Sequence, residues 1–106
     1  NDLAQPTLGH SRDDSSKFLP RDAEEKIYPD DTFQTIDQEA VGQLVKMAVE
    51  RGHAVKSGLN LGICGEHGGD PRSIPFFDSI GLDYLSFSPF RVPIARLSVA
   101  PTALER

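Results

Sequence analysis

The chain has 106 residues, of which 38% are apolar and 25% are charged, and its net charge at pH 7 is −5. This composition is typical of one globular domain at most. The acidic balance argues against nucleic acid or an anionic membrane as a partner, because both attract clustered Lys and Arg, and no apolar run approaches the length of a membrane span. A single cysteine excludes an internal disulfide framework. We therefore expect a reducing compartment, either the cytoplasm or an organelle if a leader is missing.

The first 36 residues show almost no regular periodicity. Residues 11–16 form a polar cluster, and Pro6, Pro20 and Pro29 each interrupt any regular element. A structureless segment of this length is uncommon in a compact domain, and its aromatic and aliphatic side chains favour a functional loop over disorder. We therefore expect residues 1–36 to form a long loop on the active-site side, lying over a surface that the chain does not itself contain.

A helix is predicted next, with Asp37 as its N-cap, Arg51 in its last turn and Gly52 as its stop. Its apolar residues follow the three-and-four spacing of a single buried stripe. The predicted stripe consists of Val41, Leu44, Val45 and Ala48.

A short predicted strand leads to the only cysteine. Leu59, Leu61 and Ile63 alternate as in a strand, and the run stops at Cys64. Three glycines follow within residues 65–69, and we expect them to let the backbone approach a ligand closely. Sites in α/β folds are built at the carboxyl ends of strands, so this placement favours chemistry at the thiol. A lone cysteine is otherwise more often a small buried apolar residue than a catalyst.

The rest of the chain continues the alternation of helices and strands. Residues 70–80 are predicted to form a helix, with Asp70 as its N-cap, Pro71 at its first position and Gly81 at its end. Residues 83–88 are predicted to form a strand and residues 92–99 a final helix. The order helix, strand, helix, strand, helix over residues 37–100 indicates a parallel α/β unit. Two strands are too few to close a core, so we expect the C-terminal part of one eight-stranded (β/α)8 barrel domain spanning residues 1–106.

Two polar residues of the glycine-rich turn have open roles. Glu66 and His67 either contact a ligand or hold the turn by hydrogen bonds. Cys64 and His67 also have the spacing of half a zinc site, but His10 and His53 are remote in sequence and no second pair completes tetrahedral ligation. We therefore do not predict a zinc site.

Four parts of the chain carry a recognisable pattern: Asn1-Asp2-Leu3, the loop residues 11–14 and 17–19, Gly62–Pro71 and Ser86–Leu97. Together they resemble the C-terminal end of the pyruvate, phosphate dikinase family. Related phosphoenolpyruvate (PEP) synthases and the first enzyme of the sugar phosphotransferase system share the Asn-Asp and Cys-Gly-Glu elements, but not the loop or the Ser-Pro-Phe-Arg-Val-Pro ending. The resemblance implies a (β/α)8 barrel that binds pyruvate or PEP with Mg²⁺.

The resemblance also implies a role for individual residues. Cys64 corresponds to the proton donor to the enolate, Asp2 to a magnesium ligand, and Asn1 and Asp2 to substrate-binding residues. A thiol suits this role because it is mostly protonated near neutral pH yet can release its proton. A carboxylate oxygen is the type of ligand that Mg²⁺ prefers. In a barrel, Asp2 and Cys64 would lie on one catalytic face.

The implied parent enzyme interconverts ATP, phosphate and pyruvate with AMP, diphosphate and PEP. It does so through a phosphohistidine on a domain outside this chain, and that domain and a second copy of the barrel in a homodimer are the implied protein partners. The isolated 106 residues are expected to be inactive. The alternative is an inactive truncated remnant or a non-catalytic association module.

Overall fold

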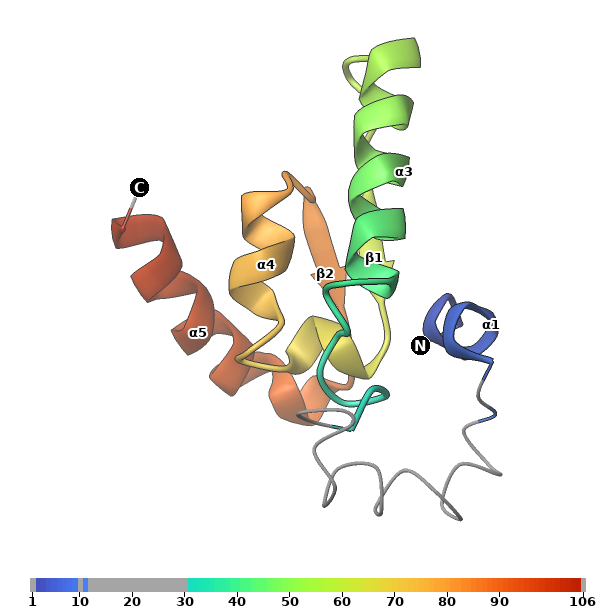
Figure 1. Cartoon of the computed structure of the whole chain (residues 1–106). Helices are drawn as coiled ribbons and strands as arrows, with labels where there is room; N and C mark the ends of the chain where they lie inside the picture. Colours follow the sequence, from blue (N-terminus) through green and yellow to red (C-terminus); the bar gives the residue numbers. More distant parts are fainter. Residues whose placement is uncertain (1, 10, 12–30, 106) are drawn as a thin grey trace.

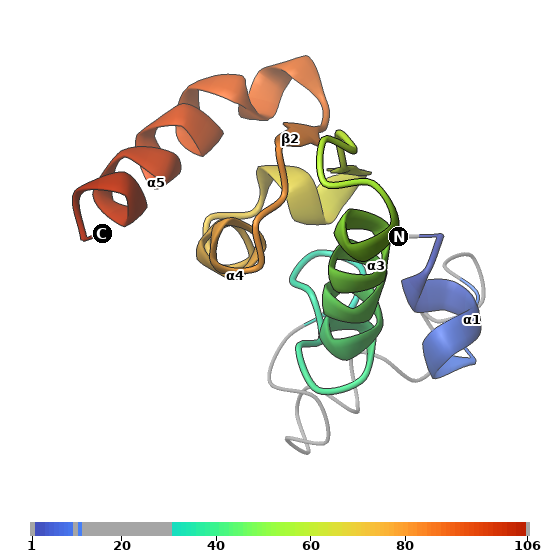
Figure 2. The same cartoon turned by 90° about the horizontal axis from the view of Figure 1, so that it is seen from above.

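The computed structural model describes residues 2–9, 11 and 31–105. Figure 1 shows the helices and strands in chain order, and Figure 2 shows the same elements from above. None of the helices in these residues is both long and apolar enough to cross a membrane. The elements are α1 (Ala4–Leu8), α3 (Val41–Val55), β1 (Gly62–Cys64), the 3-10 helix η2 (Glu66–Gly69), α4 (Ile74–Ser79), β2 (Tyr84–Ser86), the 3-10 helix η3 (Pro89–Arg91) and α5 (Val92–Leu104).

Strands β1 and β2 form a parallel pair, and α4 lies in the connection between them. Opposite each other in the register are Gly62 and Tyr84, Ile63 and Leu85, and Cys64 and Ser86. The middle pair is half-buried and packs against the core, whereas the two outer pairs are exposed on the other face. The Tyr84 ring lies directly over the Cα of Gly62. One face of this sheet is therefore covered and the other is bare.

The helices form a row, in the order α5, α4, α3 and α1 in both views (Figures 1 and 2). The main core lies where α3, α4 and the sheet meet, and Phe77 at its centre has no exposed surface. Burial of these apolar side chains is the main force that holds α3 and α4 on the sheet. The buried members of the core are Ala4, Ile36, Val41, Val45 and Phe77.

Helix α3 confirms a predicted helix, but its ends differ from the prediction. Asp37 lies one turn before α3, where Ala40 takes the N-cap position, but its Oδ2 accepts hydrogen bonds from the N–H groups of Ala40, at 2.9 Å, and Val41, at 3.2 Å. These bonds close a turn before the helix, which begins at Val41. Gly52 does not stop the helix, which continues to Val55.

The predicted buried stripe of α3 is half wrong. Val41 and Val45 are buried, but Ala48 and Leu44 are exposed, Leu44 by 40%, and Val49 is buried in their place. Gly42 explains the difference, because a Cβ on this residue would lie 2.9 Å from Cζ of Phe76. The Phe76 ring occupies the space that a side chain at Gly42 would fill, so the buried face of α3 includes Gly42 in place of Leu44.

The second predicted helix starts later than expected. Asp70 is not its N-cap: Asp70 directly follows η2, and α4 begins four residues later at Ile74, with Ser73 at the N-cap position. The buried Oγ of Ser73 donates to Asp70 Oδ2 at 2.6 Å and accepts the N–H of Ile36 at 2.9 Å. The Asp70 carboxylate is therefore engaged in a tertiary tie. Gly81, with φ of 81°, follows the end of α4 as predicted.

The remaining elements differ in length or were not predicted. Both strands are confirmed but have three residues each, and α5 extends past the predicted end to Leu104, with Pro101 inside it. Helix α1 lies in the segment expected to be a loop: Pro6 is in its first turn, where an N–H is not needed, and Gly9, with φ of 68°, ends it. The described residues form an α/β unit without a closed barrel, so the (β/α)8 barrel stays a prediction.

Candidate functional site

A cavity of about 350 Å³ lies beside the edge of β1, between α1 and α3. Asp2, Cys64 and His67 all line it, although Asp2 is 62 residues from Cys64 along the chain. Aliphatic side chains such as Val41 and Val45 form much of its wall. Two of the three predicted site residues therefore share one cavity. The third, Asn1, lies outside the described residues.

Cys64 is the last residue of β1, and its thiol is free and exposed. The next residue, Gly65, has φ of 120°, a conformation that residues with a Cβ rarely adopt. Its N–H donates to the carbonyl of Ser86 at 3.0 Å, which fixes the backbone directly after the cysteine to the end of β2. The strand thus ends at the thiol, as predicted, and the chain turns at Gly65.

The other glycines of the turn serve packing against protein atoms. Gly68 and Gly69 are buried, and a Cβ on Gly68 would lie 3.1 Å from the carbonyl oxygen of Ser86. A Cβ on Gly69 would lie 2.6 Å from Cδ of Arg91. We expected these glycines to let the backbone approach a ligand. In the structure, Gly68 and Gly69 instead approach the end of β2 and the segment that follows it.

His67 holds the turn from inside. The side chain is almost completely buried, and its Nε2 lies 2.7 Å from the carbonyl oxygen of Thr32. A carbonyl only accepts, so Nε2 carries the proton and donates it. Burial lowers the pKa of His67 below its ordinary value of 6.5, which favours the neutral ring. Of the two open roles, this contact supports hydrogen bonding that holds the turn, while the ring also lines the cavity.

Glu66 is tied to the segment after β2 by an ion pair. Its Oε2 lies 3.2 Å from Nη2 of Arg91, the last residue of η3. The sequence indicates Glu66 as a polar residue of the turn but predicts no part in the site for Arg91. The signal for Arg91 was its position in the Ser-Pro-Phe-Arg stretch, and its partner could not be read from the sequence.

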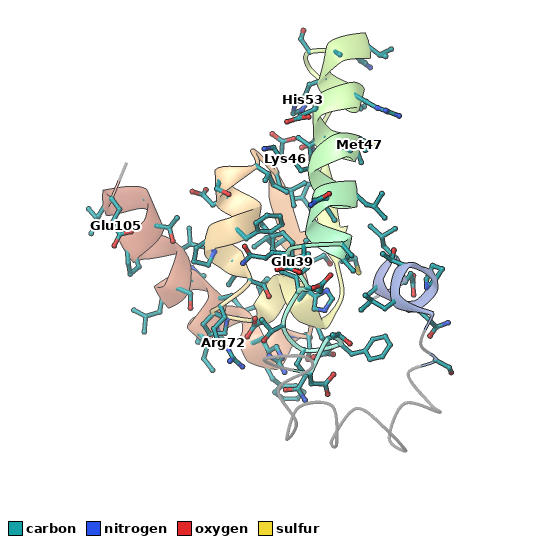
Figure 3. All side chains as sticks on the ribbon, viewed as in Figure 1. Glu39, Lys46, Met47, His53, Arg72 and Glu105 are labelled. Atoms are coloured by element: carbon teal, nitrogen blue, oxygen red, sulfur yellow. The ribbon has the colours of Figure 1, made fainter. Side chains whose placement is uncertain are left out.

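Besides His67, the structure describes one other histidine, His53. Figure 3 shows it near the C-terminal end of α3. Its Nε2 lies 3.0 Å from the carbonyl oxygen of Leu59, so it pins the connection between α3 and β1. His53 therefore has a structural role away from the Cys64 cavity, and His10 lies outside the described residues.

The described part of the chain offers only a partial set of metal ligands. It holds no group of three or more His, Cys, Asp or Glu side chains that could bind a metal ion together. Asp2 supplies one exposed carboxylate on the cavity wall. A hard oxygen of this kind fits Mg²⁺ as a single ligand, and the remaining ligands would have to come from substrate, water or other parts of the protein.

Comparison with known proteins adds a family match. Residues 1–104 match the family described as PEP-utilising enzyme, PEP-binding domain. The chain is 59% identical over 100 residues to a chloroplastic pyruvate, phosphate dikinase of Flaveria trinervia, covering 94% of this chain and 10% of that protein. It is 58% identical over 105 residues to the pyruvate, phosphate dikinase of Clostridium symbiosum, covering 99% of this chain and 12% of that protein. The chain thus spans about a tenth of the length of these relatives.

Proposed function

This chain belongs to the family of PEP-utilising enzymes, whose PEP-binding domain it matches almost end to end, and from this premise we propose that it forms part of the pyruvate and PEP site of a pyruvate, phosphate dikinase. The complete enzyme would interconvert ATP, phosphate and pyruvate with AMP, diphosphate and PEP. A phosphohistidine domain of the same parent protein would carry the phosphoryl group between the two half-reactions. The proposed compartment is the cytoplasm, or an organelle if a leader is missing.

One observation carries the proposal: Cys64 ends β1 with an exposed thiol and lines the same cavity as Asp2. Parallel strands place their sites at the carboxyl ends, where turns can present side chains and backbone groups to a ligand. The thiol is also held in place, because Gly65 directly after it is bonded to Ser86. A fixed, accessible acid beside a carboxylate is the arrangement that the pyruvate half-reaction needs.

The proposed step at Cys64 is a proton transfer to carbon. Loss of the phosphoryl group from PEP leaves the enolate of pyruvate. The S–H bond of Cys64 breaks as a C–H bond forms at the methylene carbon, which gives the methyl group of pyruvate and a thiolate. In the opposite direction the thiolate removes a methyl proton and regenerates the enolate. The same group therefore acts as acid in one direction and as base in the other.

Asp2 is the proposed contact for a magnesium ion in this site. The bound cation would stabilise the negative charge on the enolate oxygen and orient the carboxylate of the substrate. Asp2 contributes one oxygen ligand from the cavity wall. Asn1 is proposed to donate hydrogen bonds to substrate oxygens through its side-chain amide.

The test is the variant Cys64→Ala in a full-length dikinase, for example one in which this sequence replaces the matching 105 residues of the Clostridium symbiosum enzyme. We expect exchange of solvent deuterium into the methyl group of pyruvate to be abolished, while the ATP and phosphate half-reaction continues. Ser79→Ala, an exposed change on α4, is the matched control and leaves both half-reactions intact. Loss of both half-reactions in the Cys64 variant, or survival of both, would contradict the proposed role.

Helix α5 supports a second function, association with another copy of the domain. Six large apolar side chains on η3 and α5 are exposed, and four of them have a spacing that places them along one side of the helix. We propose that a homodimer covers them. Sedimentation of the protein and of a variant with Leu97→Glu tests this, and a wild type that is monomeric at all concentrations would contradict it. The four side chains along this side are Phe90, Ile94, Leu97 and Leu104.

A further inference from the structure

Arg91 reaches from the segment after β2 to the turn that follows Cys64. Its aliphatic stem lies on the backbone of Gly69, where a Cβ would come within 2.6 Å of Arg91 Cδ. Its guanidinium Nη2 lies 3.2 Å from Oε2 of Glu66. Arg91 is itself fixed by its N–H, which donates to the carbonyl of Ser88 at 3.0 Å. One side chain thus holds both the first and the last residue of η2.

Several contacts join η2 and the preceding Gly65 to the end of β2 and to Arg91. The Gly65 N–H bonds to the Ser86 carbonyl, Gly68 packs on the same carbonyl oxygen, and Arg91 holds Glu66 and Gly69. Gly65 is the residue through which η2 connects to Cys64, and its φ of 120° makes it the natural pivot of the turn. The Arg91 contacts restrict rotation of η2 about this pivot, together with the buried His67 and the contacts at Ser86. Their loss would shift the turn that directly follows the thiol.

The ion pair is a weak source of stability. Its two side chains are 38% and 32% exposed, so water screens the attraction and the pair contributes little to the free energy of folding. Its geometric effect can still be large, because a displacement of about 1 Å at a reacting group can reduce a rate by about 100-fold. A role in placing the turn therefore distinguishes Arg91 from a general stabilising residue.

We propose that Arg91, acting through Glu66 and Gly69, is a positioning residue for Cys64. The proposal rests on the proposed function, because the consequence of misplacing Cys64 is the loss of proton transfer to the enolate. Arg91 does not touch the reacting atoms in this role. Its charge and its stem act on η2, and η2 fixes the direction from which the thiol meets the substrate.

The experiment uses the full-length dikinase carrying this sequence, with the variants Arg91→Met and Glu66→Gln. Both remove the ion pair, and Met retains much of the apolar stem that covers Gly69. We expect kcat for solvent deuterium exchange into pyruvate to fall by about 10- to 100-fold, with KM for pyruvate and the ATP and phosphate half-reaction unchanged. The double variant should be no worse than either single variant, because both changes break one interaction.

Two further variants serve as controls. Arg96→Met removes a positive charge from α5, the helix that directly follows η3, and should leave kcat unchanged, because Arg96 lines a different cavity beside α4 and β2. Arg91→Lys keeps the charge without the planar fork and should restore part of the activity. If Arg91→Met does not fold, Glu66→Gln and Arg91→Lys provide the same comparison with smaller changes.

The outcomes separate this proposal from the proposed function. An increase in KM with kcat unchanged would assign Arg91 to substrate binding and overturn the positioning role. A normal kcat in both Arg91→Met and Glu66→Gln would also overturn it. Alkylation of Cys64 by iodoacetamide, followed by mass spectrometry of the Cys64 peptide, reports on the thiol directly. An alkylation rate in Arg91→Met equal to that of the wild type would also overturn the positioning role. If Cys64→Ala retains the exchange reaction, the proposed function fails, while a changed alkylation rate still supports the positioning of the thiol.

Discussion

The α3–α4 side of the molecule and helix α5 both carry apolar residues but use them differently. Helix α3 concentrates its apolar residues on one face and buries Val41 and Val45 in the core that Phe77 of α4 shares, and Val49 is also buried. Helix α5 is apolar on several faces, and among its residues only Ala95 is buried, while Leu97 is 74% exposed. A helix apolar on all sides is typical of one that is covered on more than one side. Among the described residues, α3 and α4 thus share a buried core, whereas most of α5 is exposed.

The largest expected difference between the two regions is the effect of removing an aromatic ring. Phe77→Ala empties the centre of the core that α3 and α4 share and should lower the free energy of unfolding by about 3–5 kcal/mol. Phe90→Ala, where the side chain is 92% exposed, should change it by less than about 0.5 kcal/mol. Urea unfolding followed by circular dichroism measures both. Similar effects of the two changes would show that the regions do not differ as described.

A smaller effect is expected from a buried hydroxyl. Ser73→Ala removes the acceptor of the Ile36 N–H and the donor to Asp70, and an unpaired buried group costs about 1–3 kcal/mol. The matched change on the other side is Ser98→Ala, because the Ser98 hydroxyl bonds only its own helix, at the carbonyl of Ile94, and is exposed. Its expected cost is below about 0.5 kcal/mol. Equal unfolding midpoints for the two variants would argue against a tie between residues 31–36 and α4.

Stability on the α3–α4 side should also depend on pH through His67. Burial lowers the pKa of His67 in the folded state, so the unfolded state binds the proton more readily once the pH falls below about 6.5. The free energy of unfolding should therefore decrease as the pH falls through this value, by at most about 1.4 kcal/mol per pH unit. Urea unfolding at a series of pH values measures the slope. The same series on His67→Gln should lose this component, and an unchanged slope would refute the assignment.

The smallest expected effect on stability belongs to the exposed side of α5. Leu97→Gln should change the free energy of unfolding of the monomer by less than about 0.5 kcal/mol, because the side chain loses few contacts. The same change should weaken self-association if a second copy covers this side. Unfolding measured at low protein concentration separates the two effects. A loss above about 1 kcal/mol in the monomer would mean that α5 is packed more tightly than the structure indicates.

The sequence predicted the order of the main elements, and the errors have physical causes. Cys64 at the end of a strand and Gly81 after α4 were correct because alternation and glycine stops are local signals. The predicted buried face of α3 was partly wrong because hydrophobic periodicity gives no weight to a glycine. Gly42 is buried because its missing side chain leaves room for the ring of Phe76. The start of α4 was wrong because Asp70 bonds Ser73 instead of serving as an N-cap.

The candidate site was predictable only in part. The resemblance placed Asp2 and Cys64 on one face, and they line one cavity, although their chemical roles stay predictions. The partner of His67 could not be predicted, because the carbonyl of Thr32 is 35 residues away and any residue presents such a group. The contact between Arg91 and Glu66 likewise depends on how the turns after β1 and β2 meet in space. Long-range contacts of this kind have no signature in a single sequence.

Tyr84, whose ring lies over Gly62, is a fluorescent reporter on the exposed face of the sheet. The chain contains no tryptophan and two tyrosines, and Tyr84 is one of them. Its emission is therefore not masked by energy transfer to an indole, and a Tyr28→Phe variant would assign the whole signal to Tyr84. Any strand, ligand or second subunit that covers this face would change the polarity and quenching around the phenol. Intrinsic fluorescence can thus follow the covering of this face in real time, without an attached dye.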